Sequence, residues 1–342
     1  MDEVSIIGLD LAKTVFQVHG SDADGTPLFN KRLSRSSVLS FFSEVPSCTV
    51  AMEACASAHF WGRQIGILGH EVKLIPPIYV KPFVKRQKND AADAEAIAEA
   101  ASRPTMRFVA VKGEDQQAAC MVFKTRDLFV RQKTQLANAL RGHLAEFGVI
   151  APKGIVHLKR LAAVVEEDTQ VLPASVVEYA RMILAQISAL QEQIGRLEKQ
   201  VQEHARRNDM TARLMTIPGI GPITASALCA FAPPPETFSK GRDFSAWLGL
   251  TPKQYSSGGK ERLGRTSKMG QRDLRRLLIT GAMAVVRWAV RRGAREGSWL
   301  ARMLERKPRM LVAVALANRM ARIAWALMAN GGIYKEPAAL QA

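Results

Sequence analysis

Short apolar runs separated by turn residues fill the first 80 positions of the chain. β-branched and aromatic residues between positions 4 and 33, with the turn dipeptide Asp24-Gly25, predict two or three antiparallel strands. The runs SCTVAMEA and EVKLIPP predict two more strands, the second ending at a pair of prolines. These strands alternate with helical patterns at about 36–44, 58–69 and 90–101. The order of elements predicts a mixed α/β sheet.

A longer apolar repeat follows a helical pattern at 114–147. Between Val176 and Val201, apolar residues alternate spacings of three and four over about four heptads, with charged and amide residues between them. This is the a/d pattern of a coiled coil. Two partners remain open: another helix of the same chain in an antiparallel hairpin, or a second copy of the chain. We favour the second copy, and hence an oligomer.

From residue 208 the chain becomes basic and rich in glycine, and then helical to about residue 329. Its most apolar run, MLVAVALANRMARIAWALM, contains Arg319 and Arg322. Two arginines at mid-span are costly in lipid, so we expect a buried helix with a basic edge and no membrane span. These changes divide the chain into an α/β domain at 1–150, a helical linker and coiled coil at 151–207, and a basic helical domain at 208–342.

The charge of the chain is large and unevenly placed. The net charge is +17, and residues 208–342 hold 22 Lys and Arg against 8 Asp and Glu. Such a basic part suggests a polyanion partner, with nucleic acid as the first choice and a membrane surface or the ribosome as alternatives. The four scattered cysteines argue against a zinc site and for a reducing compartment. With an acidic N-terminus that resembles no signal peptide, we expect a cytoplasmic or nucleoid-associated protein.

Four carboxylates stand at the ends of predicted elements. Asp10 ends the first strand and Glu53 the fourth, while Asp90 and Asp93 are spaced i, i+3 in the first turn of a helix. Individually each is ordinary, as a turn residue, a strand end, or a favourable charge at a helix N-terminus. If the first and fourth strands are neighbours, all four can meet, and their repulsion would require cations. Oxygen ligands suit Mg²⁺ or Mn²⁺.

The order IGLD, AMEA and NDAADA resembles the RuvC-like, ribonuclease-H-like catalytic domain of the DEDD transposases. These insertion-sequence recombinases are grouped with the Piv and MooV invertases and are guided by a bridge RNA. The segments IPGIGPITASAL and FSAWLGLTPKQYSSGGKERLGRTSKMGQRDLRRLL resemble the C-terminal domain of the same family, so the match covers essentially the whole chain. The resemblance implies a metal-binding catalytic tetrad formed by Asp10, Glu53, Asp90 and Asp93, with two Mg²⁺ ions.

The glycine-rich segment YSSGGKERLGR has two interpretations. Its composition is typical of a flexible loop that contacts DNA. The family resemblance implies in addition a serine nucleophile before the glycine, which is Ser257 here, with Ser256 beside it as the competing choice. A serine hydroxyl needs activation by a base or a metal. The site would then be composite, with carboxylates from one domain and serine from the other, in one chain or between protomers.

Several further positions are candidates for holding a phosphate backbone. Gly219 and Gly221 belong to a helix-hairpin-helix-like turn whose backbone N–H groups can hold a phosphate without reading sequence. Basic residues near the second pair of aspartates and along the C-terminal motif are the other candidates; they are Lys85, Arg86, Lys88, Lys253, Lys260, Arg262, Arg265, Lys268, Arg272, Arg275 and Arg276.

The sequence therefore predicts a DNA transposase or recombinase that cleaves, exchanges and religates strands through a covalent phosphoserine intermediate. The expected partners are donor and target double-stranded DNA, a non-coding bridge RNA by resemblance, and further copies of the chain in a dimer or tetramer. Two alternatives remain. One is a junction-resolving nuclease that uses the same carboxylates with water as nucleophile, and the other is a non-catalytic nucleic-acid-binding protein.

Overall fold

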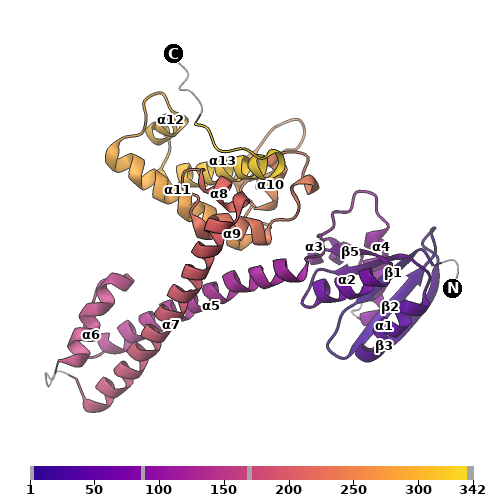
Figure 1. Ribbon diagram of the computed structural model, residues 1–342, viewed down its shortest axis with the longest axis horizontal. Coiled ribbons are helices and arrows are strands. Elements are labelled where there is room, and N and C mark those ends of the chain that lie inside the picture. The colour runs from indigo at the N-terminus through magenta and orange to yellow at the C-terminus, as the bar shows by residue number, and fades with distance from the viewer. Residues whose placement is uncertain (1–3, 86–88, 168–171, 337–342) are drawn as a thin grey trace. The chain divides into compact units, whose positions relative to one another are not determined.

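The computed structural model describes residues 4–85, 89–167 and 172–336. The chain divides into two compact units, Met1–Gln117 and Ala118–Ala342 (Figure 1). The first is a mixed α/β unit. The second is helical apart from one small hairpin. The sequence analysis assigns residues 118–145 to the α/β domain; by this division they fall in the second unit, where Leu140 and Leu144 pack on its helices.

A five-stranded sheet forms the centre of the first unit, in the order β3-β2-β1-β4-β5. β1 runs antiparallel to β2 and parallel to β4; β2 and β3 are antiparallel, and β4 and β5 are parallel. The strands are β1 (Ile6–Asp10), β2 (Val15–Ser21), β3 (Pro27–Ser34), β4 (Thr49–Glu53) and β5 (Glu71–Ile75). The mixed sheet and its antiparallel start are confirmed. The first and fourth strands are neighbours, which is the condition for the four carboxylates to meet.

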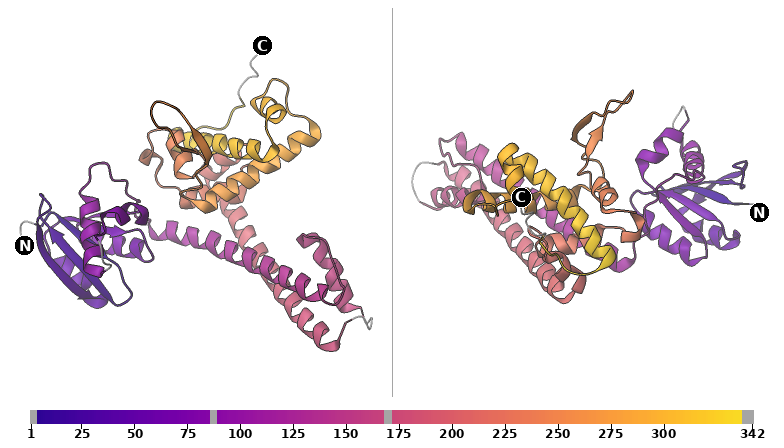
Figure 2. Two further views of the ribbon diagram at one scale, coloured as in Figure 1. Left: turned by 180° about the vertical axis from the view of Figure 1, so that it is seen from behind. Right: turned by 90° about the horizontal axis from the view of Figure 1, so that it is seen from above.

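Helices cover both faces of this sheet (Figure 2). The packing of α1 (Val38–Glu44) and α2 (Ala58–Ile67) on one face buries Ile7, Leu9, Val50 and Met52. The helix α4 (Asp90–Ala101) packs on the other face, against Ala51 and Ile75. The remaining short helices are η1 (Arg35–Ser37), α3 (Pro77–Val80) and η2 (Lys81–Phe83). Because side chains alternate between faces along a strand, Gly8 and Asp10 share the α4 face of β1.

α4 lies unusually close to β1. A Cβ atom on Gly8 would lie 2.1 Å from the carbonyl oxygen of Ala94 and 2.7 Å from the backbone nitrogen of Ala98. Glycine on the strand and alanine on the helix therefore let the two backbones approach each other. The helix begins where Asn89 caps it, since the Asn89 side chain accepts a hydrogen bond of 2.7 Å from the N–H of Ala92.

Two long helices, α5 (Glu114–Ala145) and α7 (Ala174–Arg207), form an antiparallel pair in the second unit. Arg126 bonds Glu198, and the buried Lys133 donates to Gln191, so residues later in α5 meet residues earlier in α7. The seam side chains of α7 are buried here, and they include Ala180, Ile187, Leu190, Ile194 and Val201. Our preference for a second copy as the partner of this seam is wrong, because helices of the same chain cover it. Along the chain, η3 (Ile155–His157) and α6 (Leu158–Glu166) connect α5 to α7.

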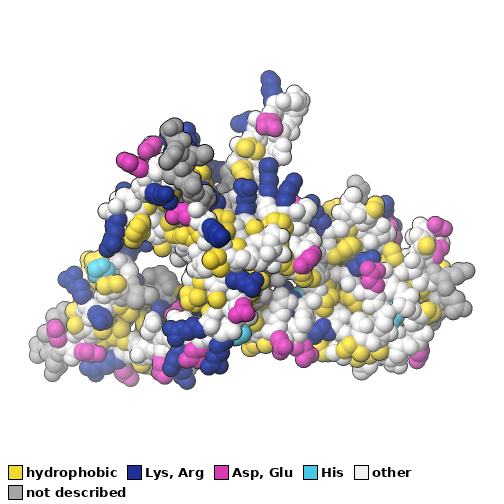
Figure 3. Space-filling view, turned by 45° about the horizontal axis from the view of Figure 1, so that its top comes forward, with side chains coloured by type: hydrophobic (Ala, Val, Ile, Leu, Met, Phe, Trp, Pro, Cys, Tyr) yellow, Lys and Arg dark blue, Asp and Glu magenta, His cyan; other side chains and the backbone are white. Residues whose placement is uncertain are grey.

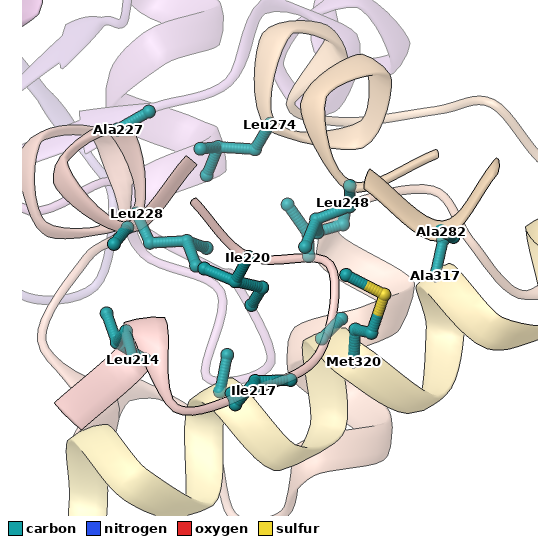
Figure 4. Packing of buried hydrophobic residues seen from close by; sticks show 14 of the residues in the cluster. Leu214, Ile217, Ile220, Ala227, Leu228, Leu248, Leu274, Ala282, Ala317 and Met320 are labelled. Atoms are coloured by element: carbon teal, nitrogen blue, oxygen red, sulfur yellow. The ribbon is translucent and has the colours of Figure 1, made fainter. Parts of the chain in front are cut away.

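The rest of the second unit is a helical domain with a single core (Figure 4). Its elements are α8 (Asp209–Met215), α9 (Pro222–Phe231), η4 (Pro235–Thr237), α10 (Gly241–Trp247), β6 (Pro252–Gln254), β7 (Leu263–Thr266), α11 (Arg272–Arg292), α12 (Trp299–Arg306) and α13 (Arg309–Asn330). In the described part of the chain, α13 is the one helix long and apolar enough to span a membrane. Its side chains Val312, Ala317 and Met320 are buried in this core, as expected.

Candidate metal centre and serine hairpin

The ends of two parallel strands bring Asp10 and Glu53 to the same edge of the sheet. Leu9 is the register partner of Met52, and the next residue on each strand is the carboxylate. Both carboxylates lie on the face that α4 covers, because they alternate with Leu9 and Met52, which are buried on the opposite face. The sheet therefore supplies two acidic side chains at its carboxyl edge.

The helix α4 supplies the other two predicted carboxylates. Asp90 and Asp93 lie on the same helix face as Ala94 and Ile97, which pack on the sheet, since residues three and four apart are neighbours on a helix. The carboxylate oxygens of Asp10, Asp90 and Asp93 lie within 4.8 Å of one another. Glu53 is outside this distance group, although its charge acts on Asp10. The structure thus gathers three of the four predicted carboxylates closely, with the fourth on the adjoining strand.

The electrostatics of this acidic cluster favour a cation. Burial and the charges of Asp93, Asp90 and Glu53 raise the pKa of Asp10 from 3.8 to about 6. Each of these effects disfavours the ionised carboxylate, and a bound divalent cation would reverse them. All the donors are oxygen atoms, the ligand type that hard cations such as Mg²⁺ and Mn²⁺ prefer. The residues present fit a divalent metal.

Sequence reasoning overlooked two residues that position the cluster. Gly8 lets α4 approach β1, and Asn89 fixes where the helix begins, directly before Asp90. A glycine inside the apolar run IIGLD is itself a signal of close backbone approach, and Asn before an Ala-rich helix is a capping signal. Three basic residues before Asp90 are candidate phosphate contacts. Lys85 is ion-paired with Glu95, while Arg86 and Lys88 lie outside the described residues.

The predicted serine lies at the tip of an ordered β-hairpin rather than in a loop without structure. β6 pairs with β7 antiparallel, and an isolated bridge joins Ser257 to Lys260. Between them Gly258 and Gly259 have φ angles of 57° and 76°, and the N–H of Lys260 bonds the carbonyl of Ser257 at 3.1 Å. Two successive positive φ angles define a type I′ turn, for which the glycines are needed. The hairpin projects from the helical domain in the right view of Figure 2.

The two adjacent serines differ in their contacts. The Ser256 Oγ accepts hydrogen bonds from the backbone N–H of Arg262 at 3.2 Å and from the Gln254 side chain at 3.3 Å. The Ser257 hydroxyl is exposed and makes no hydrogen bond to any residue that the structure describes. Ser256 therefore joins the two arms of the hairpin, whereas Ser257 presents its hydroxyl at the tip.

The candidate phosphate contacts fall into two groups. Exposed cations lie along the hairpin and at the start of α11; they are Lys253, Lys260, Arg262, Arg265, Lys268 and Arg272. Figure 3 shows a narrow projection carrying Lys and Arg side chains. Two others have structural partners: Arg275 donates to the carbonyls of Leu248 and Met269, and Arg276 is ion-paired with Asp127. Contacts within the protein therefore already occupy the guanidinium groups of Arg275 and Arg276 in part.

The glycine turn between α8 and α9 also shows two different environments. Gly219 has φ 88°, and a Cβ atom on it would lie 2.9 Å from the carbonyl oxygen of Gly281 on α11. Gly221 is exposed with open space around it and immediately precedes α9. The turn is packed against α11 on one side and open on the other, which leaves Gly221 as the better-placed candidate for a phosphate.

An acidic cluster at the carboxyl edge of a mixed sheet, in a chain with a strongly basic helical domain, is the combination expected of a metal-dependent enzyme that acts on nucleic acid. Family comparisons agree with this class. A DEDD transposase model of the IS110 type matches residues 7–148, and the model described as the transposase IS116/IS110/IS902 family matches residues 211–296.

Similar proteins extend over the whole chain. It is 48% identical to a probable family 20 transposase of Pseudomonas aeruginosa, over 97% of this chain and 99% of that protein. It is 43% identical to the transposase for insertion sequence element IS1328 of Yersinia enterocolitica, over 98% of this chain and 100% of that protein. It is 36% identical to the transposase for insertion sequence element IS1111A of Coxiella burnetii, over 98% of this chain and 92% of that protein. The chain belongs to the IS110/IS116 family of insertion-sequence transposases, which decides against the non-catalytic alternative.

Proposed function

We propose that this transposase cleaves and rejoins DNA by bringing the acidic cluster and Ser257 to the same phosphodiester. The observation that carries the proposal is the gathering of the Asp10, Asp90 and Asp93 oxygens within 4.8 Å, in a protein of a DNA-transposing family. The exposed position of Ser257 on a defined turn supports its role as nucleophile. Ser256 is the weaker candidate, because the hairpin already uses its hydroxyl.

Asp10, Glu53, Asp90 and Asp93 would hold the divalent ion, for which Mg²⁺ is our first choice and Mn²⁺ the second. When bound, the ion supplies positive charge to a phosphodiester whose oxygens gain negative charge during transfer. The chain's own residues do the positioning. β1 and β4 fix Asp10 and Glu53, and the close packing of α4 on Gly8 fixes Asp90 and Asp93. Rigid elements hold catalytic groups more accurately than loops do.

In the covalent step the Ser257 Oγ forms a bond to phosphorus as the bond to one bridging oxygen breaks. The serine proton passes to a base, and the departing oxygen takes up a proton to become a free DNA hydroxyl. Religation is the reverse attack by a hydroxyl on the phosphoserine, which releases the serine. The phosphodiester energy is kept in the serine ester, so the reaction needs no nucleotide cofactor.

The partners are part of the same proposal. Exposed cations on the hairpin can follow phosphate backbones without reading bases, which suits a protein whose target choice is delegated to a paired RNA. Donor and target duplexes, a bridge RNA and further copies of the chain complete the assembly. Since α5 already covers the α7 seam, copies would associate through another surface.

Ser257→Ala tests the nucleophile against its neighbour. With a DNA substrate carrying the element ends, the expected result is loss of the covalent protein–DNA adduct on denaturing gels for Ser257→Ala and Asp90→Asn. Ser256→Ala should retain the adduct, with a less stable hairpin. If Ser257→Ala cleaves DNA at the normal rate while Asp90→Asn does not, the enzyme is a nuclease that uses water, and the phosphoserine proposal fails.

A further inference from the structure

A basic groove with an aromatic floor lies on the helical domain, and the described residues that line it include neither the four carboxylates nor Ser257. It has a volume of about 1320 Å³ and runs between α10, the base of the β6–β7 hairpin, α12 and α13. This exceeds the ~300–1,000 Å³ typical of a small-molecule pocket, so the groove suits a segment of a polymer. We call it the α13 groove.

The charged side chains that line the α13 groove, among the residues that the structure describes, are all basic. Six cations line it, and in the described part of the chain none of them forms an ion pair with a carboxylate; they are Lys240, Arg242, Arg265, Arg319, Arg322 and Lys335. Six like charges gathered around one concave surface repel each other, and an anionic polymer would relieve that repulsion.

The floor of the groove is apolar and partly aromatic. Trp299, Trp325 and Tyr334 line it together with aliphatic side chains such as Leu311 and Ile323. The Arg319 guanidinium lies 5.4 Å from the centre of the Trp299 ring, so a cation and an aromatic face are already combined. A second hollow continues past Trp299, Arg319 and Tyr334, which line both.

We propose that the α13 groove binds a stretch of unpaired nucleotides, whose bases contact the aromatic floor and whose phosphates contact the cationic rim. A duplex hides its base faces in the stack and would leave the apolar floor without a partner. Single strands expose both phosphates and base faces, which is the combination that cationic grooves with aromatic residues bind. A second copy of this chain is a poor occupant, because it would bring the same excess of positive charge.

The inference rests on the proposed function, in which strands are opened and exchanged, but its test avoids the chemistry. Binding is measured in a Ser257→Ala background with EDTA present. The probes are labelled dT12, labelled U12 and a labelled DNA duplex, followed by fluorescence anisotropy at several salt concentrations. The two single strands distinguish DNA from RNA as the source of the unpaired nucleotides.

The first variant removes charge from two exposed positions, Lys240→Gln with Arg322→Gln. Single-strand affinity should fall about tenfold, and the slope of log K against log salt should fall by about 1.4, or ~0.7 per lost phosphate contact. Duplex affinity should change less than about twofold, because a duplex that does not enter the groove loses no phosphate contact there. The matched control is Arg181→Gln with Lys199→Gln, two exposed cations on α7, which should leave single-strand affinity unchanged.

The second variant separates ring stacking from folding. Tyr334→Leu removes the aromatic face and should weaken single-strand binding by about five- to tenfold or more, while Tyr334→Phe keeps the ring and should bind normally. Unchanged single-strand affinity in both variants would overturn the proposal. So would an equal loss of duplex binding, or an acidic 12-residue peptide that competes better than dT12 and U12. Failure of the serine chemistry alone would leave these binding results intact.

Discussion

Gly8→Ala is the sharpest test of how the fold builds the acidic cluster. The new Cβ atom would lie 2.1 Å from the Ala94 carbonyl oxygen, whereas ordinary contacts begin at 3.4 Å. The obstructing atoms belong to the helix backbone, which cannot rotate away as a side chain can. α4 must therefore retreat from β1 by about 1 Å, and it carries Asp90 and Asp93 with it.

The expected cost follows from this displacement. Overpacking of a tight contact destabilises a protein by about 1–3 kcal/mol. A misplacement of about 1 Å at a catalytic group can lower the rate by roughly a hundredfold. Gly8→Ala should therefore reduce DNA cleavage far more than the stability loss explains, at a temperature where the variant is still folded. Urea unfolding gives the first quantity, and the rate of adduct formation at saturating Mg²⁺ gives the second.

Gly66→Ala is the matched control. Gly66 lies on α2 in the same unit, and a Cβ atom there would have nothing within 4 Å. This variant should be as stable as the parent or up to about 1 kcal/mol more stable, because alanine restricts the unfolded chain. A Gly8→Ala protein with normal stability and a normal cleavage rate would refute the idea that this close approach positions the aspartates.

Three further predictions concern Asp10, the cap of α4 and the turn of the β6–β7 hairpin. In metal-free protein the raised pKa of Asp10, about 6 against 3.8, means that the folded state holds the proton more tightly, so stability should fall as pH rises from about 4 to 6. After a discount for solvent screening the loss is about 1–2 kcal/mol, measured by urea unfolding with EDTA, and it should vanish in Asp10→Asn or with Mg²⁺. Asn89→Ala should cost about 1 kcal/mol by loss of the helix cap, seen in the same assay, and a neutral result would contradict the capping role. Gly259→Ala places a side chain at φ 76° and should destabilise the turn by about 1 kcal/mol. Its adduct yield should fall while Mg²⁺ binding, measured by calorimetry, stays normal; an unchanged yield would contradict the role of the turn in presenting Ser257.

Local patterns predicted the α/β unit well because its strands and helices are short and strongly marked. The helix at 90–101 matches α4 in full. The contact of the first and fourth strands was only a condition in the sequence analysis, and the strand order of the sheet meets it. These two features were enough to bring Asp10 and Asp93 together. The finer arrangement, in which Glu53 lies outside the closest group, depends on side-chain positions that no periodicity specifies.

The errors have a common physical cause. A heptad pattern states which face of a helix is apolar, but not which helix covers it, so the α5 partner of Ile187 could not be read from α7 alone. In the same way, a count of positive charges cannot tell that Arg276 is paired with Asp127 while Arg272 faces solvent. Long-range pairing decides both, and it is encoded in residues far away along the chain.

The antiparallel pairing of α5 and α7 determines which insertions into these two helices the fold should tolerate. Its contacts repeat along both helices, from Arg126 with Glu198 to Lys133 with Gln191. A matched insertion of seven residues in each helix would add one heptad, with its a and d layers, to the seam and leave the existing α5–α7 contacts in register. This stretch is therefore the part of the chain where whole-heptad insertions should be tolerated, and where a one-residue insertion should be harmful.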